Sequence, residues 1–394
     1  LPIFERAKAL GPDDVRPYLS IADIYERQGK IPEAEKEVRS VLTKYPDLVS
    51  GHLKLGELFI KQGKFEEALS EGEKTLKQDP ELIQSHLIMG TAYLGLTKYD
   101  QAEKELLLVT RENPKSVIPY FLLAQTYYHE KQMQQAITMA KRVLEISSDH
   151  VGANMIAGVS SLALNYLEDA SHYFETALKS DPKNPLALNM LGTTYLEMGH
   201  LDDAIQAYQK ALVLDPDLHV THENIANFYG VTGDFDKAIS EYKIALQLDP
   251  EQLGTRIRLI LSYLMKKDYK KTIAEAESAL KKWPEHPTIL NLMASSYAGI
   301  KDTDKAIEYF DRAIHAKPDY LEPYLKKAGL LVLLNKPKEA VESYTAAIKA
   351  IPKSGFPHFY LGSLYAVQGK DNLAISEYET ALVKDASLEQ TLLP

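Results

Sequence analysis

The sequence predicts an all-α protein, an α-solenoid of about eleven 34-residue helix pairs. Half of the 20 prolines share one register of 34 residues, with a single gap of 68 at Ser148. Gly or Ala stands 24 residues before nearly every one of these prolines and before Ser148. In most units, Ala stands 12 residues after that small residue. The prolines in register are Pro12, Pro46, Pro80, Pro114, Pro182, Pro216, Pro250, Pro284, Pro318 and Pro352.

Each unit is expected to be a pair of antiparallel helices, as the unit 185–218 illustrates. Apolar and small residues recur at i, i+3, i+4 and i+7 over 188–195, which is one face of a helix. Gly199 then supplies a helix end, because glycine adopts the left-handed conformation at little cost. The helical spacing returns over 204–211 and ends before Pro216, since proline cannot continue a helix.

The repeat register runs along nearly the whole chain without insertion or deletion. Residues 1–14 fit the second half of a preceding unit, and residues 389–394 are expected to begin a further helix or a tail. Since no linker or composition shift interrupts the register, we expect one continuous array. The eleven predicted units are 15–48, 49–82, 83–116, 117–150, 151–184, 185–218, 219–252, 253–286, 287–320, 321–354 and 355–388.

Composition and charge exclude several classes of function. The net charge is -10, and a mildly acidic chain is a poor candidate for binding nucleic acid, which calls for a basic face. Cysteine is absent, so disulfides, thiolate zinc sites and cysteine nucleophiles are excluded. There is no signal peptide and no run of about 18 apolar residues, so we expect no direct membrane insertion by this segment.

The sequence also lacks a recognisable catalytic, cofactor or metal motif. His129 and Glu130 are not followed by the second histidine of a zinc-protease motif, and the adjacent residues 147–150 cannot fold into a hydrolase triad. We therefore predict a protein that is not an enzyme and that carries no cofactor. Four histidines recur at one repeat position and are interpreted as packing residues rather than metal ligands: His52, His86, His222 and His358.

The repeated motif closely resembles the tetratricopeptide repeat. The residues that carry the resemblance are Leu191, Gly192, Tyr195, Ala204, Tyr208, Ala211 and Pro216, with their counterparts in the other units. The resemblance implies a right-handed superhelix in which the first helix of each pair lines a concave groove. Long arrays of this kind resemble bacterial secretion and exopolysaccharide-export scaffolds, so a bacterial cytoplasm and a periplasm are both compatible locations.

The resemblance also implies which residues face the groove. An apolar set would suit an extended peptide or the apolar face of a helix, although the same residues could instead seal neighbouring helices. A polar set could pair with a peptide backbone or a carboxylate, or could simply be solvated. The apolar set is Ile88, Phe121, Leu122, Tyr128, Met155, Ile156 and Val159, and the polar set is Asn189, Asn224, Asn227 and Arg258.

The sequence thus predicts a non-enzymatic scaffold that binds a protein or peptide partner in the groove, as a segment of a larger protein or assembly. Two alternatives stay open. The array could be the substrate-recruiting arm of an enzyme whose catalytic domain lies outside this segment. It could also self-associate through uncapped ends, because no polar capping helix is evident at either end.

Overall fold

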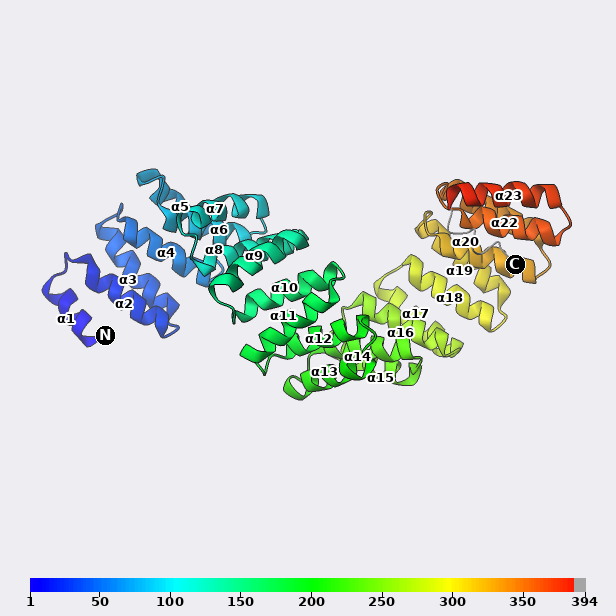
Figure 1. Cartoon of the computed structure of the whole chain (residues 1–394), viewed down its shortest axis with the longest axis horizontal. Helices are drawn as coiled ribbons and strands as arrows, with labels where there is room; N and C mark the ends of the chain where they lie inside the picture. Colours follow the sequence, from blue (N-terminus) through cyan, green and yellow to red (C-terminus); the bar gives the residue numbers. More distant parts are fainter. Residues whose placement is uncertain (386–394) are drawn as a thin grey trace. The chain divides into compact units, whose positions relative to one another are not determined.

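A computed structural model describes residues 1–385, in which there are 23 α-helices and no strands (Figure 1). The predicted all-α solenoid is confirmed: after α1 (Pro2–Leu10), helices follow one another in antiparallel pairs. The chain divides into two compact units, Leu1–Asp215 and Pro216–Pro394. The predicted start of a further helix at residues 389–394 lies outside the described residues. No helix in the described part is both long and apolar enough to cross a bilayer.

The N-terminal unit contains six helix pairs after α1, each joined by a short turn. The first helices of these pairs are α2 (Val15–Arg27), α4 (Val49–Lys61), α6 (Ile83–Gly95), α8 (Val117–His129), α10 (Val151–Ala163) and α12 (Pro185–Glu197). The second helices are α3 (Ile31–Lys44), α5 (Phe65–Gln78), α7 (Tyr99–Glu112), α9 (Met133–Ile146), α11 (Leu167–Ser180) and α13 (Leu201–Leu214).

The C-terminal unit contains five helix pairs of the same kind. Its first helices are α14 (His219–Thr232), α16 (Leu253–Met265), α18 (Pro287–Gly299), α20 (Leu321–Leu333) and α22 (Phe356–Val367). Its second helices are α15 (Phe235–Leu248), α17 (Tyr269–Lys282), α19 (Thr303–Ala316), α21 (Pro337–Ala350) and α23 (Asp371–Lys384).

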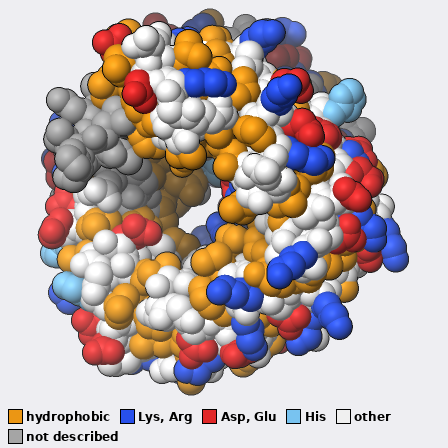
Figure 2. All heavy atoms as spheres, turned by 90° about the vertical axis from the view of Figure 1, so that its right-hand side faces the viewer, with side chains coloured by type: hydrophobic (Ala, Val, Ile, Leu, Met, Phe, Trp, Pro, Cys, Tyr) orange, Lys and Arg blue, Asp and Glu red, His pale blue; other side chains and the backbone are white. Residues whose placement is uncertain are grey.

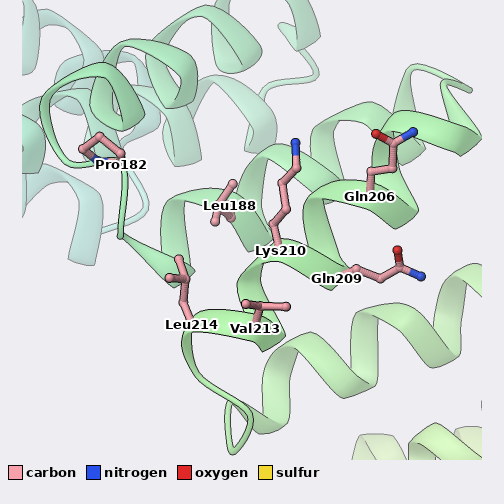
Figure 3. A pocket seen from close by; sticks show the side chains of 7 residues that line it. All are labelled: Pro182, Leu188, Gln206, Gln209, Lys210, Val213 and Leu214. Carbon is pink, nitrogen blue, oxygen red and sulfur yellow. The ribbon is translucent and has the colours of Figure 1, made fainter.

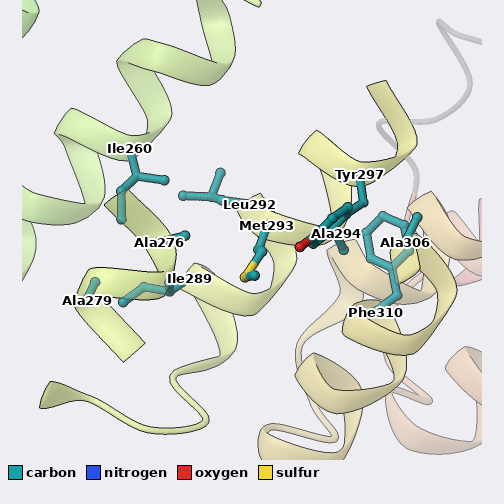
Figure 4. Packing of buried hydrophobic residues seen from close by; sticks show 10 residues of the cluster. All are labelled: Ile260, Ala276, Ala279, Ile289, Leu292, Met293, Ala294, Tyr297, Ala306 and Phe310. Carbon is teal, nitrogen blue, oxygen red and sulfur yellow. The ribbon is translucent and has the colours of Figure 1, made fainter. Parts of the chain in front are cut away.

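Small residues let the two helices of a pair approach closely, and an aromatic ring fills the remaining space. A Cβ atom added at Gly158 would lie 2.6 Å from the ring of Phe174, and one added at Gly192 would lie 2.8 Å from the ring of Tyr208. Both rings are fully buried, and burial raises the pKa of Tyr208 to about 12. In the C-terminal unit, Phe310 belongs to a buried cluster shared by α16, α17, α18 and α19 (Figure 4).

The turn inside each pair uses one residue in the left-handed conformation. This conformation favours glycine, and five of the eleven turns have glycine at this position. The other six turns have a residue with a side chain there. In the turn between α6 and α7, Thr97 has a φ of 57°. The eleven residues are Gly29, Gly63, Thr97, Lys131, Asn165, Gly199, Gly233, Lys267, Lys301, Asn335 and Gly369.

Replacing Thr97 with glycine is therefore expected to stabilise the protein. Relief of the left-handed strain on a β-branched residue outweighs the larger entropy of glycine in the unfolded chain, by about 1 kcal/mol. Urea unfolding followed by circular dichroism measures the change. The matched exchange Gly63→Thr should lower the free energy of unfolding by about 1 to 2 kcal/mol. Equal stability of the two variants would contradict this account.

Candidate functional site

The candidate site residues all lie on the first helices of the pairs, on a surface that we call the first-helix face. Of the seven apolar residues predicted there, six are half-buried: Phe121, Leu122, Tyr128, Met155, Ile156 and Val159. Ile88 differs, because its side chain is only 4% exposed and contacts α4 beside Gly56. The apolar set thus packs against neighbouring helices over much of its surface.

Contacts of individual residues show what this packing does. The ring of Phe121 lies 4.7 Å from that of His150, and its edge closes the space beside Gly152 at the start of α10. Met155 and Val159 pack against the buried cluster that contains Phe174 and Leu191. Leu122, Tyr128 and Ile156 border a second cluster, around Leu123 and Tyr127. These side chains therefore join consecutive repeats while leaving part of their surface accessible.

The polar set is only partly accessible. Asn189 is fully buried in α12, whereas Asn224 and Asn227 are half-buried in α14. The hydroxyl of Tyr242 donates a hydrogen bond of 2.6 Å to Oδ1 of Asn227. The guanidinium of Arg258, on α16, forms an ion pair with the carboxylate of Glu223 on α14. Arg258 thus already has a carboxylate partner. A ligand would have to displace Glu223 or bind the guanidinium in addition to it.

A charged cluster occupies the first-helix face of α2 and α4. Nζ of Lys54 lies 2.5 Å from Oε2 of Glu26 and also pairs with Asp23. Burial alone would raise the pKa of Glu26, but hydrogen bonds from Lys54 and Lys61 hold it below its ordinary value. The acidic and basic groups of this cluster satisfy one another, so the cluster offers a ligand little unpaired charge.

The most exposed apolar side chains of the first-helix face lie on α20 and α22. Leu333 is 84% exposed, Val367 is 86% exposed and Tyr360 is 41% exposed. With their neighbours they line a hollow of about 220 Å³, which we call the C-terminal apolar groove. The groove residues are Gly329, Val332, Leu333, Tyr344, Tyr360, Ser363, Leu364 and Val367.

The floor of the groove is held by side chains from the second helices. The ring of Tyr344 on α21 stacks on that of Tyr360, at 6.2 Å between centroids and an angle of 8°. The hydroxyl of Tyr378 on α23 donates to Oγ of Ser363 at 3.1 Å. Figure 2, in which the C-terminal unit faces the viewer, shows hydrophobic side chains exposed between scattered acidic and basic ones. The stacked rings and the hydrogen bond of Ser363 hold the groove in a fixed shape.

A polar network lies next to this groove, at the other end of α20. Lys326 pairs with Glu322 at 2.6 Å and donates to Oγ of Ser295 at 3.1 Å. The hydroxyl of Tyr320 donates to Glu322 at 2.8 Å. Burial alone would raise the pKa of Glu322, but hydrogen bonds from Lys326 and Tyr320 hold it below its ordinary value. A ligand along α20 would thus meet an ion pair at one end and apolar side chains at the other.

The four recurring histidines pair with glutamates of the second helices. Nδ1 of His52 lies 2.5 Å from Oε2 of Glu71, and its Nε2 lies 2.6 Å from the carbonyl oxygen of Pro46. Each ring nitrogen of His52 therefore faces one oxygen atom. The same pairing joins His86 to Glu105, His222 to Glu241 and His358 to Glu377.

In the repeats of His52, His86 and His222, this arrangement joins the turn before the first helix to the following second helix. Within residues 1–385 there is no group of three or more His, Asp or Glu side chains placed to hold a metal ion. The histidines were recognised from the sequence, but the glutamates were not predicted as their partners. Their constant spacing of 19 residues was the signal that could have revealed them.

The C-terminal apolar groove was also missed from the sequence. Leu333 and Val367 occupy the same repeat position in consecutive units, and it is one of the positions expected to face the groove. The predicted site residues belong to the third to eighth units. Val231 and Met265 stand at this position in the seventh and eighth units, so the sequence indicates the position but does not single out the last two units.

Comparison with protein families matches several parts of the chain to the tetratricopeptide repeat. Models described by that name match residues 3–82, 185–218, 221–252, 257–320 and 321–354. A model described as anaphase-promoting complex, cyclosome, subunit 3 matches residues 104–177. No curated protein matches the sequence.

Several solved structures are similar to this chain. Yeast Tom70 is 16% identical over 97% of this chain and 94% of its own, with a TM-score of 0.49. A tetratricopeptide repeat protein from Parabacteroides merdae is 16% identical over 63% of this chain and 98% of its own, with a TM-score of 0.49. The MamA protein is 21% identical over 43% of this chain and 92% of its own, with a TM-score of 0.40. At these identities the likeness concerns the fold alone.

Proposed function

The chain belongs to the tetratricopeptide repeat family of protein–protein interaction scaffolds, and we propose that it binds an apolar partner segment in its C-terminal apolar groove. One observation carries the proposal: Leu333 and Val367 are more than four-fifths exposed, side by side in a preformed hollow. Covering such side chains is favourable, and a groove that is already shaped loses little entropy on binding.

The ligand proposed is a protein segment with apolar side chains on one face, such as an amphipathic helix. The groove lies between two parallel first helices, α20 and α22, whose exposed residues form its walls. The half-buried set from Phe121 to Val159 is a second candidate surface on the same kind of face. Asn224, Asn227 and Arg258 remain candidates for polar contacts with the partner. Ile88 and Asn189 are not proposed to contact the partner, because their side chains are buried.

Capture of partner proteins by the immobilised chain tests the proposal. The double variant Leu333→Glu with Val367→Glu is expected to reduce capture by about tenfold or more, because each carboxylate would be desolvated against the apolar ligand. The matched control is Val383→Glu with Ile375→Glu, which places two charges on exposed apolar positions of the second helix α23. Equal loss of capture by both pairs would contradict the proposal.

A second pair of variants distinguishes the two candidate surfaces. Phe121→Glu with Met155→Glu changes the half-buried set instead of the C-terminal groove. Phe121 packs on His150 and beside Gly152, so its replacement could disturb the fold. The circular dichroism and thermal unfolding of this double variant must therefore first match those of the parent chain. Loss of partners by this folded variant, with retention by the groove variant, would move the binding surface to α8 and α10.

A further inference from the structure

A second hollow lies on the pair α12–α13 and is formed mainly by the second helix. It has a volume of about 410 Å³, within the range of small ligand pockets. Leu188 of α12 borders it together with side chains along α13 (Figure 3). Val213, at its edge, is 81% exposed. The hollow is lined by Pro182, Leu188, Gln206, Gln209, Lys210, Val213 and Leu214.

The apolar character of this pocket comes from apolar residues at positions that are polar in other repeats. Where four other repeats place the histidine and glutamate of the buried pair, this repeat has Leu188 and Ala207. The equivalent hollow of the repeat 83–116 is polar and is lined by His86 and Arg111, among others. The equivalents of His86, Arg111 and Glu112 in the pocket on α12–α13 are Leu188, Val213 and Leu214, so apolar side chains replace these polar groups.

Charge at this pocket has one sign only. Lys210 is the sole charged residue among those that line it. In the part of the chain that the structure describes, Lys210 forms no ion pair and no side-chain hydrogen bond, whereas the basic residues at the same repeat position in three other units, Lys74, Arg142 and Arg312, each pair with a glutamate. An unpaired ammonium beside an apolar hollow is complementary to a ligand that joins an aliphatic group to a carboxylate.

The length of the pocket favours an extended polypeptide segment over a small molecule as its ligand. Its lining runs from Gln206 to Leu214 along α13, which is about 12 Å at the helical rise per residue. That length accommodates three to four residues of extended chain, at about 3.3 Å each. The side-chain amides of Gln206 and Gln209 precede Val213 and Leu214 along α13 (Figure 3), and they can donate to and accept from the peptide backbone next to an anchoring residue.

We propose that this pocket binds an extended acidic–aliphatic segment of a partner protein. A Leu, Ile or Val side chain enters the space between Leu188, Val213 and Leu214. The carboxylate of an adjacent Asp or Glu pairs with Lys210. This surface belongs chiefly to a second helix, so it serves a partner contact independent of the first-helix face.

Methyl NMR of the full chain, labelled at leucine and valine, tests the proposal directly. The probe is the hexapeptide Gly-Ser-Leu-Asp-Ser-Gly with acetylated and amidated ends. It is expected to shift the methyl signals of Leu188, Val213 and Leu214 in a saturable way. An otherwise identical peptide with Asn in place of Asp should bind about three- to fivefold more weakly, as for a surface ion pair. A peptide with Lys there should bind more weakly still.

Matched variants separate the pocket from its surroundings. Val213→Gln introduces the residue that the next repeat has as Gln247, and Leu188→His with Ala207→Glu introduces the pair found in four other repeats. Both changes are compatible with the fold and should abolish the shifts of the remaining signals. Lys210→Gln should remove the preference for Asp over Asn. Lys179→Gln, on the neighbouring second helix α11, should leave it unchanged.

Three results would overturn the proposal. The first is the absence of saturable shifts at millimolar peptide. The second is equal or tighter binding of the Lys peptide. The third is that octanoate, a free aliphatic carboxylate, binds more tightly than the Asp peptide, which would make the site one for a small molecule.

Discussion

Replacing Phe310 with alanine is expected to lower the free energy of unfolding by about 3 to 5 kcal/mol. The ring is 1% exposed and lies in the cluster with Ala294, Ala306 and Tyr297 (Figure 4). Because the two alanines leave the ring as the main filler between α18 and α19, its removal opens a cavity that backbone movement closes only in part. Urea unfolding followed by circular dichroism measures the loss.

The control for this prediction is an exposed apolar residue of the same unit. Leu333→Ala removes a side chain that is 84% exposed and should change stability by less than about 0.5 kcal/mol. Hydrogen exchange should also show the largest loss of protection from α18 to α20, since a repeat is stabilised by its immediate neighbours. Similar effects of the two variants, or uniform loss of protection, would contradict the packing described.

Replacing His52 with leucine is expected to cost about 3 kcal/mol, because it leaves the carboxylate of Glu71 buried without its main partner. His52 and Glu71 are 7% and 6% exposed, and the remaining contact of Glu71 is with Lys74 at 2.7 Å. The double variant His52→Leu with Glu71→Ala reproduces the pair found at 188 and 207. It should cost less than the sum of the two single variants, with a coupling of about 1 to 3 kcal/mol.

The repeats themselves supply a graded comparison for this pair. In the last pair the side chain of Glu377 is 25% exposed, against 8% for that of Glu71. A more hydrated carboxylate tolerates the loss of its partner better, so His358→Leu should cost less than His52→Leu. No cost at His52 would show that the pair contributes little to stability, and equal costs at both sites would contradict the expected dependence on exposure.

The architecture could be predicted from the sequence because its determinants are local and repeated. A proline such as Pro216 ends a helix wherever it stands, and a residue such as Gly199 marks a turn without reference to the rest of the fold. The small residue at Gly192 predicted a close approach, and the ring of Tyr208 occupies the space that its side chain would need. Each of these signals depends on a few neighbouring residues only.

The candidate site was harder to predict because exposure depends on the adjoining repeat. Ile88 stands at a repeat position expected to face the groove, yet Gly56 on the neighbouring helix leaves a space that it fills. Leu333 stands at another such position and stays exposed. Periodicity thus predicts on which face of the helix a residue lies. How far its side chain is buried depends on the residues of the adjoining repeat that it contacts.

The main packing contacts in each unit join a helix to the next one along the chain or to the next but one. Few distant segments have to find each other, so the entropy lost in closing each loop is small and refolding should be fast for a protein of this length. Several repeats can also serve as starting points, from which order spreads in either direction. A ribosome-bound chain could therefore begin to fold after only the first two or three repeats had emerged.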